Sequence, residues 1–465
     1  MSEHLLLLTG QLAEGALRRV MDGLDLGATT WSVRPLGVKV AALMTADLIR
    51  RRLTDTAGAD RIIIPGRCRG DLEALSRHFG CPVERGPDEL MDLPRYFGLA
   101  GRVPDLSAYD VRIFAEIVEA PRLSVEAILE QAAAFRADGA DVIDLGCLPD
   151  TPFEHLDASV RALKATGVLV SVDSMQPQEL LAGGRAGADF LLSLHEDNLW
   201  IADRVAACPV LVPKRPGDLP SLERAMARLE ANGRPYLADP ILDPIHFGFA
   251  DSIMRYHRLR QSHPTAPMLM GVGNLTELTE ADTTGINAIL MGLVSELRIG
   301  NILTTQVSPH CRSAIREADR ARRIMHWARQ ECSLPRQIDG GLSAIHERAP
   351  YPAELADIRA LAAAIRDPNY RIQVSAEGIH CFNRDGFHTS DDPFALYPHL
   401  GVEQDAGHAF YLGVELARAQ IAQQLGKRYV QNQPLRWGCV VSSAATDLSQ
   451  DHSAGTTRQK RSHKH

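Results

Sequence analysis

The sequence has no apolar run long enough to cross a membrane, which takes roughly 20 consecutive residues. Its only early apolar run is Leu5–Leu8, which follows Glu3 and His4 and ends at Thr9-Gly10. A secretory signal needs a positively charged start and a longer apolar stretch. The run therefore predicts a buried strand, and we expect the chain to be cytoplasmic.

The sequence also lacks paired cysteines and an excess of positive charge. None of its 8 cysteines forms a Cys-x-x-Cys pair, so neither a zinc knuckle nor a dithiol redox motif is indicated. Scattered, reduced thiols are typical of a cytosolic protein. The net charge of −8 predicts no general attraction to nucleic acid or to an anionic membrane. An anionic substrate would need a local site of basic side chains or backbone amides.

The chain is long enough for more than one domain. Its 465 residues predict two or three domains, and its 45% apolar content allows a sizeable core. Residues 1–105 alternate short apolar strands with helical patterns, which predicts a small α/β domain. The strands expected there are Leu5–Leu8 and Arg61–Pro65, and the helices are Val38–Arg52 and Asp71–Phe79. A linker is expected over Gly101–Ser107.

Between residues 110 and 333, strand-like and helix-like segments alternate eight times. The expected strands are Val111–Val118, Asp141–Leu145, Val168–Val172, Asp189–Leu194, Pro209–Pro213, Tyr236–Asp239, Pro267–Gly271 and Asn301–Thr305. Helical patterns fill every gap between them, for example Ser124–Asp138 and Ala281–Arg298. Eight βα units of this size predict a (β/α)8 TIM barrel whose strands are buried on both faces. The alternation alone favours this barrel without excluding a doubly wound sheet.

Residues 335–440 predict a C-terminal α+β domain. The expected strands are Arg371–Val374 and Ile379–Asn383, the second followed by a turn at Asn383–Gly386, and Gly407–Leu425 is a long helix. Residues 441–465 are mostly Ser, Thr, Asp, Gln and His with a basic end, which predicts a disordered tail.

In a TIM barrel the active site lies at the carboxyl ends of the strands, so polar residues there are the site candidates. In strand order they are Glu116, Glu119, Asp144, Asp173, Ser193, His195, Glu196, Lys214, Arg215, Asp239, Asp243, Asn274, Thr304, Thr305 and Gln306. Several carboxylates at one barrel mouth need a cation, a metal or an NH-rich ligand edge. Each residue also has an ordinary structural role open to it. Asp144 could cap a loop, His195 could be a hydrogen-bonded loop residue, and Lys214 could be surface charge.

Five segments, in this order, resemble strand motifs of the dihydropteroate synthases. Gly139–Gly146 (GADVIDLG) resembles the second strand, Val170–Ser174 (VSVDS) the third and Gly187–Ser193 (GADFLLS) the fourth. Leu237–Gly248 (LADPILDPIHFG) and Pro267–Asn274 (PMLMGVGN) resemble the sixth and seventh. The order and spacing match across the whole predicted barrel, about half of the chain. The resemblance implies a pterin-binding TIM barrel.

The sequence is more similar still to the dihydropteroate synthase-like proteins of methanogens and of bacteria that use tetrahydromethanopterin. Gly271–Glu277 (GVGNLTE) is similar to that family, and so is His408–Leu416 (HAFYLGVEL), which leads to Tyr429–Gln431. That family carries extra N- and C-terminal domains, so this resemblance covers nearly the whole chain.

A pterin presents a 2-amino group beside a ring N–H, and one fixed carboxylate can accept from both. Asp239 or Asp243 is the candidate for that edge, and the sequence does not decide between them. The resemblance implies further pterin contacts from Asp173 and Ser193, and Asn274 can donate and accept toward the ring heteroatoms. The remaining candidates at the barrel mouth are Glu116, Asp144 and His195.

Two departures from the synthases concern phosphate binding. Those enzymes carry a lysine and an arginine where this chain has Gly273–Leu275, and an Arg-x-His pair where it has Thr304–Gln306. These basic groups hold the diphosphate of the activated pterin. In this chain Lys214, Arg215 and Arg312 are the phosphate-binding candidates.

The resemblance implies a transferase of tetrahydromethanopterin biosynthesis. It would join 6-hydroxymethyl-dihydropterin diphosphate to 4-(β-D-ribofuranosyl)aminobenzene 5'-phosphate. Asn274, at the seventh strand, instead resembles the asparagine that pterin-dependent corrinoid methyltransferases carry there. The chain has no cobalamin-binding signature, however. Because the basic residues that hold the diphosphate in the synthases are absent, a third alternative is a non-catalytic protein that only binds a pterin.

The expected ligands are therefore a pterin, as substrate or ligand, and an arylamine. No tightly bound cofactor and no metal site are predicted, although Mg²⁺ could accompany a diphosphate substrate. No catalytic residue is assigned. Nucleic acid and membrane are not expected as partners, and a homodimer is left open.

Overall fold

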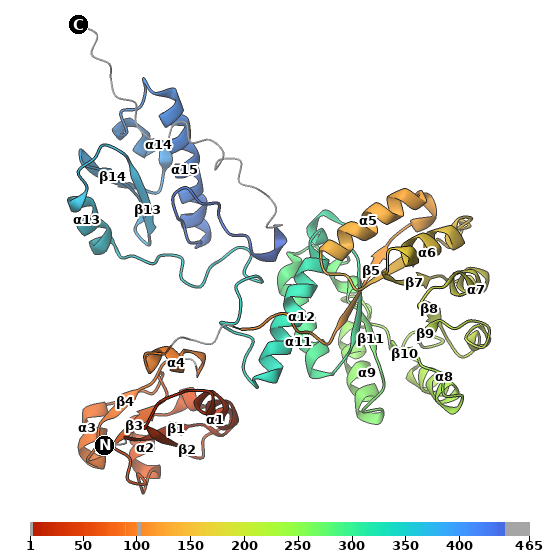
Figure 1. Ribbon diagram of the computed structural model, residues 1–465, viewed down its shortest axis with the longest axis horizontal. Helices are drawn as coiled ribbons and strands as arrows, with labels where there is room; N and C mark the ends of the chain where they lie inside the picture. The colour runs from red at the N-terminus through yellow and green to blue at the C-terminus, as the bar shows by residue number, and fades with distance from the viewer. Residues whose placement is uncertain (1–2, 89, 100–103, 442–465) are drawn as a thin grey trace. The chain divides into compact units, whose positions relative to one another are not determined.

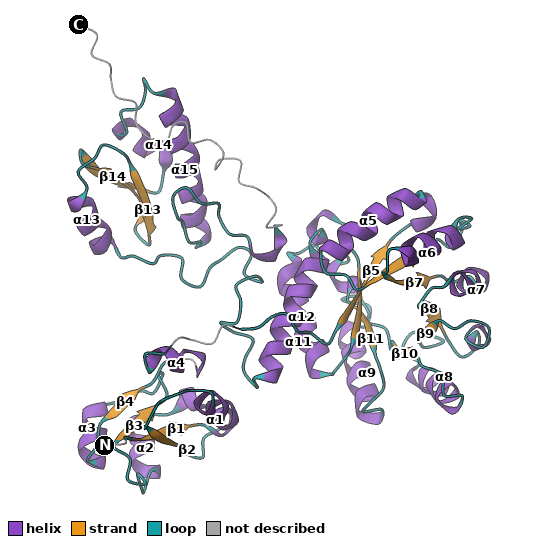
Figure 2. Cartoon of the chain, viewed as in Figure 1, coloured by secondary structure: helices purple, strands orange, loops and turns teal. Residues whose placement is uncertain are grey.

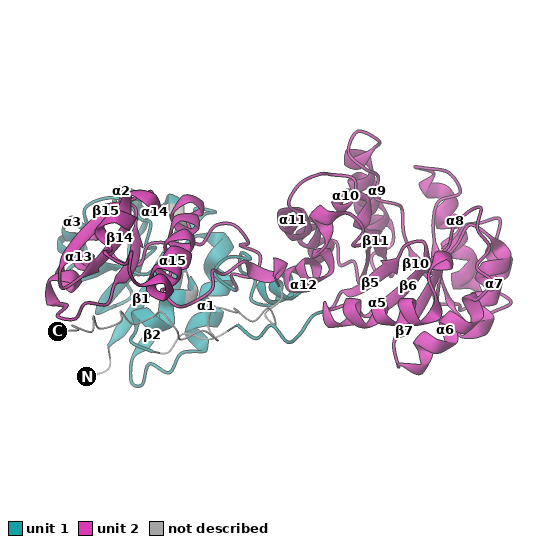
Figure 3. Cartoon of the chain, turned by 90° about the horizontal axis from the view of Figure 1, so that it is seen from above, with its two compact units in different colours: residues 1–109, 323–338 teal, residues 110–322, 339–465 magenta. Residues whose placement is uncertain are grey.

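The computed structural model describes residues 3–88, 90–99 and 104–441. Contacts divide the chain into two compact units, Met1–Tyr109 with Arg323–Ile338, and Asp110–Arg322 with Asp339–His465 (Figure 3). The first unit contains the N-terminal α/β domain, and the second contains a (β/α)8 barrel and the C-terminal α+β region. The predicted barrel domain ended at residue 333, whereas residues 323–338 group with the first unit.

A four-stranded parallel sheet forms the N-terminal domain, in the order β2-β1-β3-β4. Its strands are β1 (His4–Thr9), β2 (Thr30–Pro35), β3 (Arg61–Ile64) and β4 (Val83–Arg85), and its helical segments are η1 (Gln11–Ala13), α1 (Glu14–Asp22), η2 (Ala41–Leu43), α2 (Ala46–Arg52), α3 (Leu72–Phe79), η3 (Leu90–Asp92) and α4 (Leu93–Tyr96). Leu5 and Leu7 share an apolar cluster with α1, whereas Leu6 and Leu8 share one with α2 and α3. Because both faces of β1 are covered, the strand is a continuous apolar run.

The helix predicted over Val38–Arg52 is wrong in its first half. Helix α2 begins at Ala46, where the Thr45 side chain caps the first turn. Before it, the carbonyls of Val38 and Lys39 accept hydrogen bonds from two N–H groups of η1. Carbonyls engaged with another segment do not accept the i→i+4 bonds of a helix. The sequence analysis did not predict β2 and β4 as strands.

All eight strands predicted for the barrel are present. They are β5 (Arg112–Ile117), β6 (Val142–Gly146), β7 (Leu169–Asp173), β8 (Phe190–Leu194), β9 (Cys208–Leu211), β10 (Leu237–Ala238), β11 (Leu269–Gly271) and β12 (Asn301–Thr304). Every pairing is parallel, in the order β10-β9-β8-β7-β6-β5-β12-β11. A bridge between Ala238 and Met268 joins the two outer strands, so the sheet closes into a barrel rather than a doubly wound sheet.

Helices lie outside this ring of strands (Figure 1). They are η4 (Ala120–Arg122), α5 (Val125–Ala137), α6 (Leu156–Ala165), α7 (Pro177–Ala186), η5 (Leu199–Ile201), α8 (Leu219–Ala231), α9 (Phe249–Ser262), α10 (Gly273–Thr276), α11 (Thr283–Glu296), η6 (Pro309–Cys311) and α12 (Ala314–Gln330). The expectation of a helix in every gap is wrong between β8 and β9, which are joined through η5 alone. There the Asn198 side chain accepts from the backbone N–H of His195 at 2.7 Å and forms a turn in place of a first helical turn.

The interior of the barrel is apolar at one level and polar at the next. Buried side chains from six strands form one cluster: Phe114, Val142, Phe190, Leu192, Val210, Leu237 and Leu269. Because side chains alternate along a strand, the inward residues two positions further on face the carboxyl end. That end is where the predicted site residues belong.

The C-terminal region has an antiparallel sheet of β13 (Arg371–Ser375), β14 (Gly378–Asn383) and β15 (Gly386–Ser390), with β14 in the middle. Its helical segments are α13 (Leu355–Ala364), α14 (Pro393–Leu396), η7 (Tyr397–His399), α15 (Ala406–Leu425) and η8 (Gly438–Val440). Helix α15 shares a core with β13 and β14 (Figure 2). The two predicted strands, the turn and the long helix are confirmed, whereas β15 and α13 were not predicted.

Two predictions lie wholly or partly outside the described residues. They are the disordered tail, of which the structure describes residue 441 only, and the linker, of which it describes residues 104–107. Within the described parts of the chain, no helix combines the length and the apolar character that a membrane span requires.

Candidate active site

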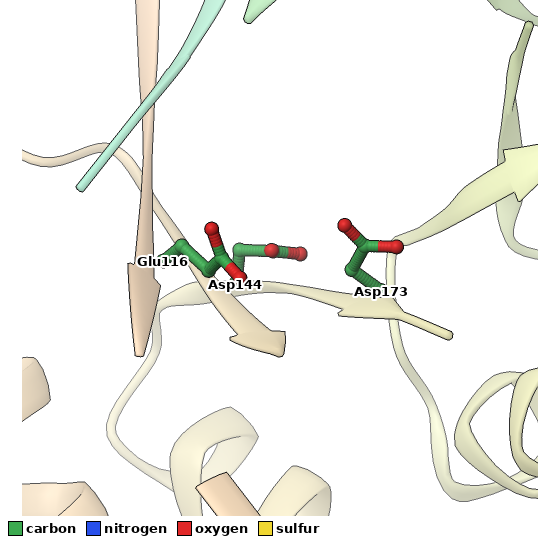
Figure 4. Close-up of side chains that lie close together, drawn as sticks. All are labelled: Glu116, Asp144 and Asp173. Carbon is green, nitrogen blue, oxygen red and sulfur yellow. The ribbon is translucent and has the colours of Figure 1, made fainter. Parts of the chain in front are cut away.

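Three carboxylates meet at the carboxyl ends of β5, β6 and β7 (Figure 4). Strand register brings them together, because Glu116 pairs with Asp144 and Gly146 pairs with Asp173. One oxygen of each carboxylate lies within 4.8 Å of the others. The three side chains therefore form one acidic cluster, which we call the acid triad.

Asp144 is the fully buried member of the triad. The Ser171 hydroxyl donates to its Oδ1, while its Oδ2 is buried and has no hydrogen-bond partner among the residues that the structure describes. Burial, followed by the charges of Asp173 and Glu116, raises the pKa of Asp144 well above its usual value. The side chain is a buried part of the cluster and not the loop cap that was its alternative role.

The other two members of the triad also hold their protons more tightly than usual. Burial and the charges of Glu116 and Asp239 raise the pKa of Asp173 to about 7. Burial and the charge of Glu277 raise the pKa of Glu116. A Cβ added at Gly146 would lie 2.5 Å from Oε1 of Glu116, so the glycine in the VIDLG segment gives this carboxylate its room.

Asp239 follows β10 and is the fourth carboxylate of the site. Its Oδ1 accepts from the Tyr256 hydroxyl at 2.6 Å and from the Ile241 N–H at 2.7 Å. Its Oδ2 has no hydrogen bond with any residue that the structure describes. Burial raises the pKa of Asp239 to about 6, against the hydrogen bonds from Tyr256 and Ile241. The charge of Asp239 raises the pKa of Asp173, so Asp239 interacts electrostatically with the triad.

Asp243, the alternative to Asp239, is held differently. Its Oδ2 lies 2.5 Å from Nη2 of Arg255, and both side chains are largely buried. Arg255 also donates to the carbonyls of Pro240 and Ile241. Asp243 therefore stabilises the loop after β10 through Arg255, whereas Asp239 keeps an oxygen available for a ligand.

Two more predicted residues lie at or just beyond the carboxyl ends of β8 and β11. Asn274 is exposed, and its Nδ2 donates to the carbonyl of Leu242 at 2.8 Å, which ties the loop after β11 to the loop after β10. Its Oδ1 has no hydrogen bond with any residue that the structure describes and can accept one from a ligand. Ser193 is partly buried at the end of β8.

The predicted basic residues do not join the acidic cluster. Nζ of Lys214 bonds to both oxygens of Asp197, at 2.8 and 3.0 Å, and both side chains are substantially exposed. Arg215 and Arg312 are exposed, and neither has an ion-pair partner in the described parts of the chain. Nδ1 of His195 accepts from the Asp197 N–H at 3.3 Å, so this side chain is a hydrogen-bonded loop residue.

Glu277, which was not among the predicted site residues, lies just beyond α10, and its charge acts on Glu116. Its carboxylate accepts from the N–H groups of Val307 and Ser308, from the Thr305 hydroxyl, and from the Cys311 thiol at 2.6 Å. Burial raises its pKa, but the bonds from Cys311, Val307 and Ser308 outweigh this and hold it at about 2. An ionised carboxylate thus organises the loop after β12, where the resembling synthases carry an Arg-x-His pair.

The arrangement as a whole is rich in acceptors and poor in donors. Four carboxylates share the barrel interior; the further charge acting on Glu116 is that of Glu277, also negative, whereas Arg255 acts on Asp239. Such a cluster binds protons, a cation or a ligand with several N–H groups. Of the residues described, the acid triad is the set whose oxygens could hold a metal ion together.

Two comparisons with known proteins match different lengths of the chain. A family of unknown function, DUF6513, matches residues 3–88. The uncharacterized protein MJ0107 of Methanocaldococcus jannaschii is 25% identical over 522 aligned positions, which cover 92% of this chain and 98% of the relative.

Similar solved structures include dihydropteroate synthases. The Yersinia pestis synthase with a pterine–sulfa conjugate has a TM-score of 0.37 and 21% identity, over 49% of this chain and 95% of that one. The Thermus thermophilus synthase in complex with 6HMPPP has a TM-score of 0.37 and 20% identity, over 47% and 93%. A complex of the Thermus thermophilus synthase with 4-aminobenzoate has a TM-score of 0.36 and 20% identity, over 48% and 95%.

Proposed function

We propose that the barrel mouth binds a reduced pterin by its 2-amino and ring N–H edge. The observation that carries the proposal is the geometry of Asp239. One of its oxygens is fixed by Tyr256 and Ile241, and the other is left for a ligand. A carboxylate fixed in this way is oriented before the ligand arrives. The N–H groups of a pterin supply the donors that the site lacks.

The surrounding residues fit the rest of a pterin ring. Asp173 belongs to the acid triad, and the charge of Asp239 acts on it. Its pKa of about 7 lets its carboxyl group accept or donate a hydrogen bond near neutral pH. Asn274 offers an amide oxygen at the rim, and Ser193 offers a hydroxyl. These four residues are the pterin contacts that we propose.

For the reaction, we propose the condensation of a hydroxymethyl-dihydropterin diphosphate with a (ribofuranosyl)aminobenzene phosphate, in tetrahydromethanopterin biosynthesis. The arylamine nitrogen forms a bond to the exocyclic carbon of the pterin. The bond from that carbon to the diphosphate oxygen breaks, diphosphate leaves, and the amine loses a proton to solvent. This assignment rests on the motif resemblance over the barrel and the terminal domains. The protein would contribute orientation and charge.

Mg²⁺ is an expected companion of a diphosphate. The acid triad fits such an ion, because its donors are all carboxylate oxygens and Oδ2 of Asp144 has no other partner. A bound ion would neutralise part of the diphosphate charge.

A non-catalytic pterin-binding protein is the second candidate. The specific observation in its favour is the ion pair of Lys214 with Asp197, which occupies one of the three cations proposed for phosphate. A pterin-dependent methyltransferase is the third, and it depends on Asn274 alone.

Turnover separates these candidates. The wild-type protein is incubated with the pterin diphosphate, Mg²⁺ and either the phosphorylated arylamine or 4-aminobenzoate, and pyrophosphate release is measured. We expect release with the phosphorylated amine, and a smaller preference for it in the Lys214→Ala, Arg215→Ala double variant. Pterin binding without release from any amine would favour the binding protein, and absence of pterin binding would overturn the proposal.

A further inference from the structure

The N-terminal domain contains a cavity that the barrel site does not use. Its volume is about 570 Å³, within the roughly 300–1,000 Å³ typical of small-molecule sites. All of its lining residues belong to the first compact unit. Any ligand it binds is therefore separate from the pterin proposed for the barrel.

The position of the cavity in the sheet is one that ligands favour. It lies at the carboxyl edge, where Thr9 ends β1, Pro65 follows β3 and Gly86 follows β4. In the order β2-β1-β3-β4, the chain leaves β1 toward one side and returns on the other side at β3. The loops after β1 and β3 therefore diverge, and open parallel sheets bind ligands in the crevice between such loops.

The turn after β1 is not built for a phosphate group. The N–H groups of Gln11 and Leu12 donate to the carbonyls of Val38 and Lys39 at 2.8 and 3.1 Å. A Cβ at Gly10 would lie 2.6 Å from the backbone nitrogen of Ala41, so the glycine permits this close covering. Backbone N–H groups in such a turn can bind the phosphates of a nucleotide when no other acceptor is bonded to them. Here they are already used.

The wall of the cavity is apolar. Leu7 and Ile63 come from the strands, Leu17 and Val20 from α1, and Leu93 from α4. At the mouth, apolar side chains also face solvent.

Three of these mouth residues are Leu12, Val40 and Leu334, with exposed fractions of 74%, 44% and 72%. Single exposed leucines are common, but several around one cavity mark a surface that contacts a ligand. An apolar ligand body would remove them from water.

The charged residues of the mouth include Lys39, Arg67, Asp88, Glu331 and Arg336. Arg67 lies 3.7 Å from Asp88, and both side chains are largely exposed. Lys39 has neither an ion pair nor a side-chain hydrogen bond to any residue that the structure describes. Lys39 is therefore available to pair with an anionic group of a ligand.

We propose that this cavity binds a small amphipathic organic anion. Its aromatic or aliphatic body lies on Leu7, Leu17 and Ile63, and its single anionic group, such as a carboxylate, lies beside Lys39. The used N–H groups of the β1 turn exclude a polyphosphate as the anionic part.

Two dyes with the same aromatic body test both halves of the proposal. 1-Anilinonaphthalene-8-sulfonate carries an anionic group, and N-phenyl-1-naphthylamine is its neutral counterpart. We expect the full-length protein to bind the sulfonate with one site in this domain and more tightly than the neutral dye. ATP should not displace it.

Matched variants of exposed residues assign the site. Lys39→Glu should weaken sulfonate binding by about two- to fivefold and leave the neutral dye unchanged, whereas Arg77→Glu, the same charge change away from the cavity, should change neither. Leu12→Glu should weaken both dyes at least about fivefold. Leu43→Glu is its control, because Leu43 is 72% exposed and does not line the cavity.

The folded state of each variant is checked by its melting temperature. Equal binding by wild type, Lys39→Glu and Leu12→Glu would overturn the proposed site. Displacement of the dye by ATP would overturn the ligand class in favour of a nucleotide. The barrel variant Asp239→Asn should bind the dye as wild type does, so this result does not depend on the pterin proposal.

Discussion

At the scale of single residues, the site depends on carboxylates that resist ionisation. Asp173 has a pKa of about 7 in the folded protein, against 3.8 for an unperturbed aspartate, because of burial and the charges of Glu116 and Asp239. Between these two values the folded state binds more protons than the unfolded state. Its stability therefore falls as pH rises from about 4 to about 7.

Replacing Asp173 by Asn should remove this part of the pH dependence. We expect the melting temperature of Asp173→Asn, relative to wild type, to increase between pH 4 and pH 8. Thermal unfolding of both proteins across that range provides the measurement. A constant difference would show that Asp173 ionises in the folded protein as it does in the unfolded chain.

The sequence predicted most of these residues and missed one for a physical reason. Glu116, Asp144 and Asp173 lie within or at the end of apolar strands, and Asp239 directly follows one, so the barrel rule alone places them at one end. Glu277 follows no strand directly, and its partners are two backbone N–H groups and two side chains some thirty residues away, which no sequence pattern reveals. The choice between Asp239 and Asp243 likewise depended on the hydrogen bonds each one makes.

At the scale of elements, β6 positions the triad through a glycine. Gly146→Ala would bring a Cβ to 2.5 Å from Oε1 of Glu116 and displace that carboxylate. We expect weaker pterin binding and a protein that still folds. Gly292→Ala, in α11 where an added Cβ has no neighbour within 4 Å, is the control.

Isothermal titration with a reduced pterin compares the two variants. If Gly146→Ala bound pterin as tightly as Gly292→Ala, the position of Glu116 would be irrelevant to the ligand.

Hydrophobic patterns predicted some of the strands and helices correctly and others wrongly. All eight barrel strands are short, apolar and buried on both faces, and this signal is strong. The pattern failed at Val38–Arg52, where carbonyls bond to η1, and between β8 and β9, where Asn198 forms a turn. Both errors come from hydrogen bonds made outside the local segment or by a side chain.

At the scale of the whole molecule, some parts of the structure can be predicted from sequence patterns and others cannot. The barrel has a repeating pattern, whereas the grouping of residues 323–338 with the N-terminal unit depends on tertiary contacts. No local property of that segment predicts which unit it joins.

The end of the chain gives a prediction at this scale. Residues 441–465, the predicted tail, have few apolar side chains to offset the entropy of ordering. A chain that ends after Val440 should therefore keep its solubility and melt within about 2 °C of wild type. A markedly lower melting temperature would mean that the last residues belong to the folded structure.

The central claim is that Asp239 binds the N–H edge of a pterin. In Asp239→Asn the amide oxygen can still accept from Tyr256, but an NH₂ group then faces the pterin donors. Donors that face donors in a buried site cost about 1–3 kcal/mol, or roughly 5- to 150-fold in affinity. Asp251→Asn, exposed in the first turn of α9, is the matched control.

The most direct measurement is isothermal titration of 6-hydroxymethyl-7,8-dihydropterin into wild type, Asp239→Asn, Asp243→Asn and Asp251→Asn. We expect a loss of this size in Asp239→Asn, a smaller loss in Asp243→Asn, which acts through Arg255, and none in Asp251→Asn. Wild-type affinity in Asp239→Asn would contradict the central claim, and wild-type affinity in Asp243→Asn as well would contradict the whole pterin site.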